Sequence, residues 1–155
     1  MKIKKIVISF FILLIGVLLG GYIFRDTQPR SFLRFDDCDE TCLESNELLG
    51  LVGSVVAQKS PELIPSIAKE TDKTIAIDSP VHRAPIHYVI IPKKDIKDIA
   101  NLTQEDKEYL TDSYAVIGEI IREAGLREYK VYTNGPSYQT VNYLHFHILA
   151  EESEN

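Results

Sequence analysis

The first 25 residues restrict the fold of this chain more than any other part of it. Residues 6–24 form a run of 19 positions without a charged side chain, and Lys2, Lys4 and Lys5 precede it. As a helix rising about 1.5 Å per residue, the run spans roughly 28 Å, close to the thickness of a bilayer's hydrocarbon core. A basic start followed by an apolar run is typical of a signal anchor or a cleaved signal peptide, and the lack of an Ala-x-Ala-like cleavage site favours the anchor. We therefore expect residues 1–25 to be a transmembrane signal anchor, with a signal peptide as the alternative, and the rest of the chain to be periplasmic or extracellular.

The remaining length suits one globular domain. Residues 26–155 carry 13 basic and 23 acidic side chains, a formal net charge of −10. Such a charge repels nucleic-acid backbones and anionic lipid surfaces, so we expect no nucleic-acid partner. A small anion is still a suitable ligand, because local amides and a few cations can bind it.

The two cysteines, Cys38 and Cys42, lie in a linker that we assign to residues 26–43. Their spacing and the expected export favour a local disulfide or free thiols. A zinc site would need two more ligands, and only His82 and His87 are uncommitted, so this interpretation is weaker. For His87 itself we expect a satisfied, partly buried side chain on a strand.

The pattern of residues 44–151 predicts a domain of mixed helix and strand. Apolar positions at helical spacing predict a helix over residues 45–59, and a second, clearer helix follows a polar start at residues 101–105 and ends at Gly125. Short β-branched and aromatic runs predict strands over residues 74–77, 88–91, 129–133 and 141–150. This order favours an α+β domain with an antiparallel sheet, and residues 152–155 are expected to be a solvated tail.

Two histidines alternate with apolar residues near the C-terminus. Because a strand has a period of two residues, Tyr143, His145 and His147 are expected on one face of the sheet. The opposite face then holds Leu144, Phe146 and Ile148. A bare histidine pair fits three roles: satisfied polar residues on an exposed face, action on a bound anion, or metal ligation.

Polar residues just before the histidine pair favour the anion. Asn134-Gly135 and Gln139-Thr140 supply amide and hydroxyl donors and a turn whose backbone amides can approach a phosphate. They add no carboxylate or thiol that would complete a metal shell.

The order of these residues resembles the histidine triad (HIT) family, whose motif is His-x-His-x-His followed by two apolar residues. The likeness extends to residues 84–94, Ala-Pro-Ile-His-Tyr-Val-Ile-Ile-Pro-Lys-Lys, and to residues 133–135, Thr-Asn-Gly, and it spans roughly residues 73–150. It implies a HIT-like antiparallel sheet with one long helix, and a symmetric homodimer. It also implies a nucleotide hydrolase or nucleotidyl transferase that acts on phosphoanhydride or phosphoramidate bonds, with no metal or other cofactor in the covalent step.

The resemblance implies a role for each matching position. His145, the middle histidine, is the nucleophile that attacks the α-phosphate and forms a covalent nucleotidyl-histidine. His147 contacts the phosphate and stabilises the charge of the transition state. Because the nucleophile must be neutral, activity is expected to fall below about pH 6. The residues that hold phosphate, leaving group or ribose are Asn134, Gln139, Thr140, Tyr143 and Asp78.

Two positions depart from the family. Tyr143 stands where the first histidine belongs, and Asp95 stands where many members have another histidine. A tyrosine retains the backbone carbonyl that orients the nucleophile in the family, but a phenol with a pKa of about 10 cannot carry a proton near neutrality. Two alternatives therefore stay open beside the enzyme: a noncatalytic module that binds nucleotides or another small anion, and an extracytoplasmic metal-binding protein that uses His145 and His147.

Overall fold

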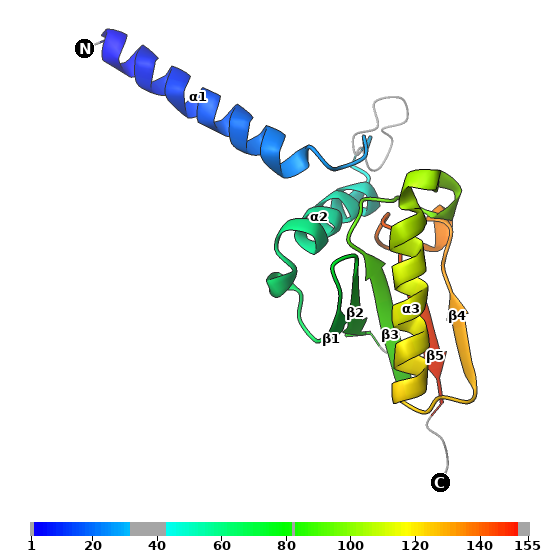
Figure 1. Ribbon diagram of the computed structural model, residues 1–155. Coiled ribbons are helices and arrows are strands. Elements are labelled where there is room, and N and C mark those ends of the chain that lie inside the picture. Colours follow the sequence, from blue (N-terminus) through cyan, green and yellow to red (C-terminus); the bar gives the residue numbers. More distant parts are fainter. Residues whose placement is uncertain (1, 32–42, 82, 152–155) are drawn as a thin grey trace.

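The computed structural model describes residues 2–31, 43–81 and 83–151 (Figure 1). The expectations for Cys38, Cys42 and His82 concern positions outside these residues. A helix of 23 residues, α1 (Lys2–Phe24), projects from the domain, which begins with α2 (Ser45–Lys59). In the described part of the chain, Lys4–Phe24 is long and apolar enough to cross a membrane, and its most apolar stretch is not buried against the domain.

One antiparallel sheet forms the centre of the domain. Its strand order is β1-β2-β3-β5-β4, so the C-terminal strand lies between β3 and β4. The strands are β1 (Ile67–Glu70), β2 (Thr74–Asp78), β3 (Ile86–Pro92), β4 (Tyr129–Tyr132) and β5 (Phe146–Ala150). In the β3–β5 pair, Val89 lies opposite His147 and His87 opposite Leu149.

One face of the sheet packs under a long helix, α3 (Lys107–Glu123), as Figure 1 shows. Its buried residues Val116, Ile117 and Ile120 meet alternate strand residues. The helix ends where Gly125 adopts a φ of +62°, a left-handed conformation that glycine tolerates best. Residues of this core include Ala76, Ile90, Ile96, Leu144, Phe146 and Ile148.

The opposite face carries α2 at one end and the histidines at the other. Ala57 of α2 packs with Ile75 and Tyr143 in a second buried cluster. Strand alternation places His87 and His147 on this face, away from α3. Short 3-10 helices in the connections are η1 (Pro61–Leu63), η2 (Ile99–Asn101), η3 (Gln104–Asp106) and η4 (Pro136–Tyr138).

The α+β class, the antiparallel sheet and the long helix are confirmed, while two details differ from expectation. Strand β1 was not predicted. The predicted strand over residues 141–150 begins only at Phe146, because Tyr143 N–H bonds to Val141 O and Leu144 N–H bonds to Ile96 O rather than to a neighbouring strand. His145 therefore lies on a non-strand segment that leads into β5.

Candidate active site

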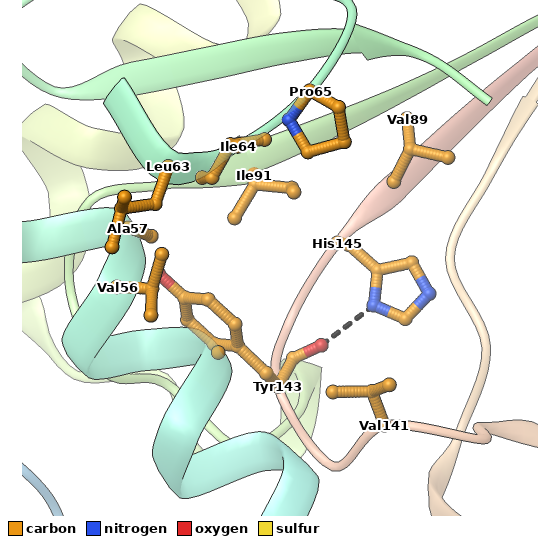
Figure 2. Close-up of a pocket in the computed structure, with 11 residues that line it drawn as sticks. Val56, Ala57, Leu63, Ile64, Pro65, Val89, Ile91, Val141, Tyr143 and His145 are labelled. Carbon is orange, nitrogen blue, oxygen red and sulfur yellow. Dashed lines mark hydrogen bonds between the residues drawn. The ribbon is translucent and has the colours of Figure 1, made fainter. Parts of the chain in front are cut away.

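His145 has one ring nitrogen fixed by the backbone. Its Nδ1 lies 2.6 Å from the carbonyl oxygen of Tyr143, and a dashed line marks this bond in Figure 2. A carbonyl oxygen can only accept, so Nδ1 carries the proton of the neutral ring. The other nitrogen, Nε2, then has a free lone pair, which a nucleophile requires.

His147 and His87 form a buried relay beside it. His147 Nδ1 lies 2.9 Å from His87 Nε2, and the two side chains come from neighbouring strands. His87 Nδ1 lies 2.8 Å from Val81 O and 3.3 Å from the N–H of Arg83. The shorter contact is to an acceptor, so we place a proton on His87 Nδ1, and His147 Nδ1 then donates to His87 Nε2.

His147 Nε2 is the end of this relay. It is buried and has no hydrogen-bond partner among the described residues. The His145 ring stands edge-on to the His147 ring, with 4.9 Å between their centroids, and Tyr132 stacks on His147 at 4.8 Å. An anion beside both rings would give His147 Nε2 a partner once that nitrogen takes up a proton.

Burial keeps both histidines neutral. It lowers the pKa of His145, against the raising effect of the bond to Tyr143 O, and the Arg83 charge lowers it further. Burial also lowers the pKa of His147 to about 3, and the nearby rings of His145 and His87 and the charge of Arg83 act in the same direction. A bound phosphate would reverse these effects, because a negative charge raises the pKa of a neighbouring imidazole.

An apolar pocket of about 400 Å³ opens beside His145. Figure 2 shows side chains of α2, the segment after it and strand β3 arranged around this space, with the ring of Tyr143 next to Val56 and the ring of His145 farther along. The ring of Tyr143 forms part of its wall, and Gly53 on α2 contributes no side chain there. Its apolar lining consists of Val56, Ala57, Leu63, Ile64, Pro65, Val89, Ile91 and Val141.

The phenol of Tyr143 turns away from His145. It is 4% exposed and its hydroxyl donates to the carbonyl oxygen of Pro92. Burial raises the pKa of this phenol, and the charge of Asp95 raises it further. Tyr143 therefore contributes its backbone carbonyl to His145 and its ring to the pocket wall, while its hydroxyl is held in the core beneath α2.

The upstream polar residues are arranged as a loop around η4. Gln139 is buried, and its amide N–H donates to Asn134 O at 2.7 Å, which braces the loop across η4. Thr140 is exposed. Asp78 is exposed at the end of β2, where strand alternation gives it the face of Ala76, on the α3 side of the sheet. The structure thus brings together His145, His147 and the carbonyl of Tyr143, but it does not place Asp78 on their face.

Two residues of the site were not singled out for it from the sequence. His87 was expected to be a satisfied, partly buried strand residue, and no role at the histidine pair was predicted for Arg83. The strand register that pairs β3 with β5 brings His87 to His147, and the charge of Arg83 acts on both His145 and His147. No group of three or more His, Cys, Asp or Glu side chains in the described ranges is arranged to hold a metal ion.

The sequence of this chain is similar to a known family and to several known proteins. Residues 53–155 match the family model described as scavenger mRNA decapping enzyme C-term binding. An uncharacterized HIT-like protein of Synechococcus elongatus is 30% identical over 106 residues, which cover 66% of this chain and 90% of that protein. One of Synechocystis is 32% identical over 91 residues, or 57% of this chain and 80% of that protein.

Solved structures agree with the sequence matches. A HIT family hydrolase from Clostridium thermocellum superimposes with a TM-score of 0.59 at 27% identity, over 67% of this chain and 92% of that one. A HIT family hydrolase from Legionella pneumophila gives the same TM-score of 0.59 and 27% identity, over 66% of this chain and 93% of that one. On the family model, the sequence matches and the shared fold together, this chain belongs to the histidine triad family.

Proposed function

We propose that this protein is a nucleotide hydrolase or nucleotidyl transferase that uses His145 as a covalent nucleophile. The family and fold support a nucleotide-binding or hydrolase function in general. The covalent role of His145 is supported by the hydrogen bond from its Nδ1 to Tyr143 O. It leaves the Nε2 lone pair unprotonated, on a ring that lines the pocket.

The chemistry needs two displacements at one phosphorus atom. The Nε2 lone pair attacks the α-phosphorus of a phosphoanhydride or phosphoramidate, and a P–N bond forms while the bond to the leaving group breaks. The leaving group takes the electron pair of that bond and, where it is an amine, also a proton from the solvent. Water then attacks the same phosphorus, the P–N electron pair returns to Nε2, a water proton is released, and a nucleoside monophosphate departs. A second nucleophile in place of water makes the reaction a transfer.

His147 would stabilise the phosphate in both steps. Its buried Nε2 has no partner among the described residues, and a proton acquired there as the anion binds would make it a donor to a phosphate oxygen. The adjacent pocket suits the nucleoside, because its apolar lining can pack on both faces of a base. Few polar groups line it, so we expect weak selection among bases.

Product release and a covalent intermediate test the proposal. The full chain, purified in detergent, is incubated with dinucleoside polyphosphates and nucleoside phosphoramidates, and nucleoside monophosphate is measured. We expect His145→Ala to lower turnover by at least about 10³-fold. A substrate labelled at the α-phosphate should also label the native chain in an acid-labile, alkali-stable form, and His145→Ala should stay unlabelled. Release that persists in His145→Ala, or binding of nucleotides without any release, would contradict the covalent mechanism, and the second result would favour the binding module.

We further propose that α1 anchors the protein in a membrane, with the domain outside the cytoplasm. The length and apolar surface of Lys4–Phe24 support this, and so do the lysines that precede the apolar run. The chain should resist extraction from membranes by alkaline carbonate, and protease added to spheroplasts should remove the domain. The symmetric homodimer that the resemblance implies stays a prediction, which light scattering on the solubilised chain can measure.

A further inference from the structure

A residue of the connection after α1 lies inside the domain. Arg30 comes six residues beyond Phe24, the last residue of α1, and its side chain is 1% exposed. Its guanidinium pairs with Asp95, whose side chain is fully buried. A second guanidinium nitrogen donates to the carbonyl oxygen of Asn142 at 2.6 Å. Arginine suits this task because its planar fork can serve a carboxylate and a carbonyl at the same time.

These bonds bracket Tyr143 on both sides. The peptide before Tyr143 is held at Asn142 O by Arg30. The peptide after it is held by the N–H of Leu144, which donates to Ile96 O at 2.6 Å, and Ile96 directly follows Asp95. With both flanking peptides fixed, the two backbone dihedral angles of Tyr143 have little freedom. The direction of the Tyr143 carbonyl is set as a result, and that carbonyl is the acceptor for His145 Nδ1.

Helix α2 also packs against the peptide between residues 142 and 143. Gly50 is buried so close to it that an added Cβ would lie 2.3 Å from Asn142 O and 3.1 Å from the nearer guanidinium nitrogen of Arg30. The Asn142 side chain donates to Glu47, and its N–H donates to Asn46 O at 3.0 Å. The peptide between residues 142 and 143 is therefore enclosed by α2 and Arg30, and it has no room to rotate while the arginine is in place.

We propose that Arg30 is a positioning residue for the nucleophile. Paired with Asp95, it fixes the carbonyl of Tyr143 and thereby the tautomer and direction of the His145 ring. The inference rests on the proposed function for its catalytic meaning. Its structural content, the dependence of the His145 ring on Arg30, can be measured without any substrate.

The test compares two double variants of the full chain in detergent. Arg30→Met with Asp95→Asn removes both members of the fully buried pair, and the asparagine can still accept from the N–H of Gln28, which bonds to Asp95 at 2.6 Å. Glu47, the second carboxylate beside Arg30 at 3.5 Å, is partly exposed and keeps the hydrogen bond from the Asn142 side chain. The control, Asp26→Asn with Lys59→Gln, removes another ion pair between the same connection and α2, at 2.6 Å, that does not touch residues 142–144. Arg30→Lys serves as a milder third variant, because a lysine keeps the charge but lacks the fork.

The first readout is the ¹⁵N spectrum of the histidine rings. Native chain and control should show His145 protonated at Nδ1, whereas Arg30→Met/Asp95→Asn should show a mixture of tautomers, and Arg30→Lys a smaller change in the same direction. An unchanged His145 signal in a folded Arg30→Met/Asp95→Asn chain would overturn the proposal. If the Arg30→Met/Asp95→Asn chain does not fold, an unchanged His145 signal in Arg30→Lys would overturn the proposal instead.

The second readout is turnover. A misdirected nucleophile should lower kcat by about 10- to 100-fold, while KM changes less than threefold and the control keeps native values. A shift of the ring signal without any turnover by the native chain would leave the positioning role intact and count against the proposed function instead. A kcat within twofold of native, with the ring signal shifted, would show that the ring direction does not govern the reaction and would overturn the catalytic part of the inference.

Discussion

Replacement of Gly50 by alanine should destabilise the domain, although alanine is the better helix former. The added Cβ would lie 2.3 Å from Asn142 O and 2.8 Å from Asn142 C, and both distances are roughly 1 Å shorter than an ordinary contact. Both atoms belong to a backbone that Arg30 and α2 hold, so they cannot move aside cheaply. Overpacking of this kind costs about 1–3 kcal/mol, and the helix-propensity gain returns about 1 kcal/mol. Because the close contacts are with held backbone atoms, we expect the upper part of that cost, about 2–3 kcal/mol, and so a net loss of roughly 1–2 kcal/mol.

Gly53 supplies the matched control on the same helix. Its added Cβ would meet Tyr143 Cδ1 at 3.8 Å and Val141 Cγ1 at 3.9 Å, which are ordinary contacts. Gly53→Ala should therefore gain up to about 1 kcal/mol from helix propensity alone. Thermal unfolding followed by circular dichroism separates the two variants, since 1 kcal/mol moves the Tm of a domain this size by about 3–5 °C. Equal shifts for Gly50→Ala and Gly53→Ala would refute the close approach of α2 to Asn142.

Three further expectations follow from the site. Tyr143→Phe loses the phenol's hydrogen bond to Pro92 O and should destabilise the domain by about 1–3 kcal/mol in thermal unfolding, yet keep kcat within about threefold, because the carbonyl that orients the nucleophile remains. The acid limb of the kcat/KM pH profile should lie below pH 6.5, since the pKa of His145 is lowered from 6.5 and only its neutral form attacks; a limb above that pH would contradict the assignment. The pKa of His147 is about 3 in the folded chain against an ordinary 6.5, so the unfolded chain binds more protons between these values and stability falls as pH drops through this range. Through this one group, the free energy of unfolding should fall by about 2 kcal/mol between pH 7 and pH 5. In His147→Gln, the fall in the free energy of unfolding between the same two pH values should be smaller by that amount.

The central parts of the site could be predicted because their signals are local. The alternation of residues 143–149 separates the polar rings from Leu144, Phe146 and Ile148, and those three residues do pack under α3. The resemblance of the same segment to a family motif indicated the fold. The retained carbonyl at Tyr143 also followed from the backbone alone, and the structure shows it bonded to His145.

The remaining contacts join positions far apart in the chain, and no short-range pattern encodes them. His87 meets His147 across 60 residues through the register of two strands. Arg30 meets Asp95 across 65 residues, from a stretch that reads as polar linker. Residues 141–145 look like a strand by periodicity, but backbone N–H groups of this segment donate to Asn46, Val141 and Ile96 rather than to a neighbouring strand. The hydrophobic pattern of the sequence cannot show which of these distant residues contact one another.

The buried arginine also limits how far the domain can stand from the end of α1. Arg30 is only six residues beyond Phe24, and a fully extended chain of that length reaches at most about 22 Å. A connection free all the way from Phe24 to Ser45 would allow about 70 Å. If α1 spans a membrane as proposed, the pocket beside His145 lies within a thin layer above the lipid headgroups. Molecules confined to that surface would then meet it by lateral diffusion, whereas soluble ones would have to enter the layer first.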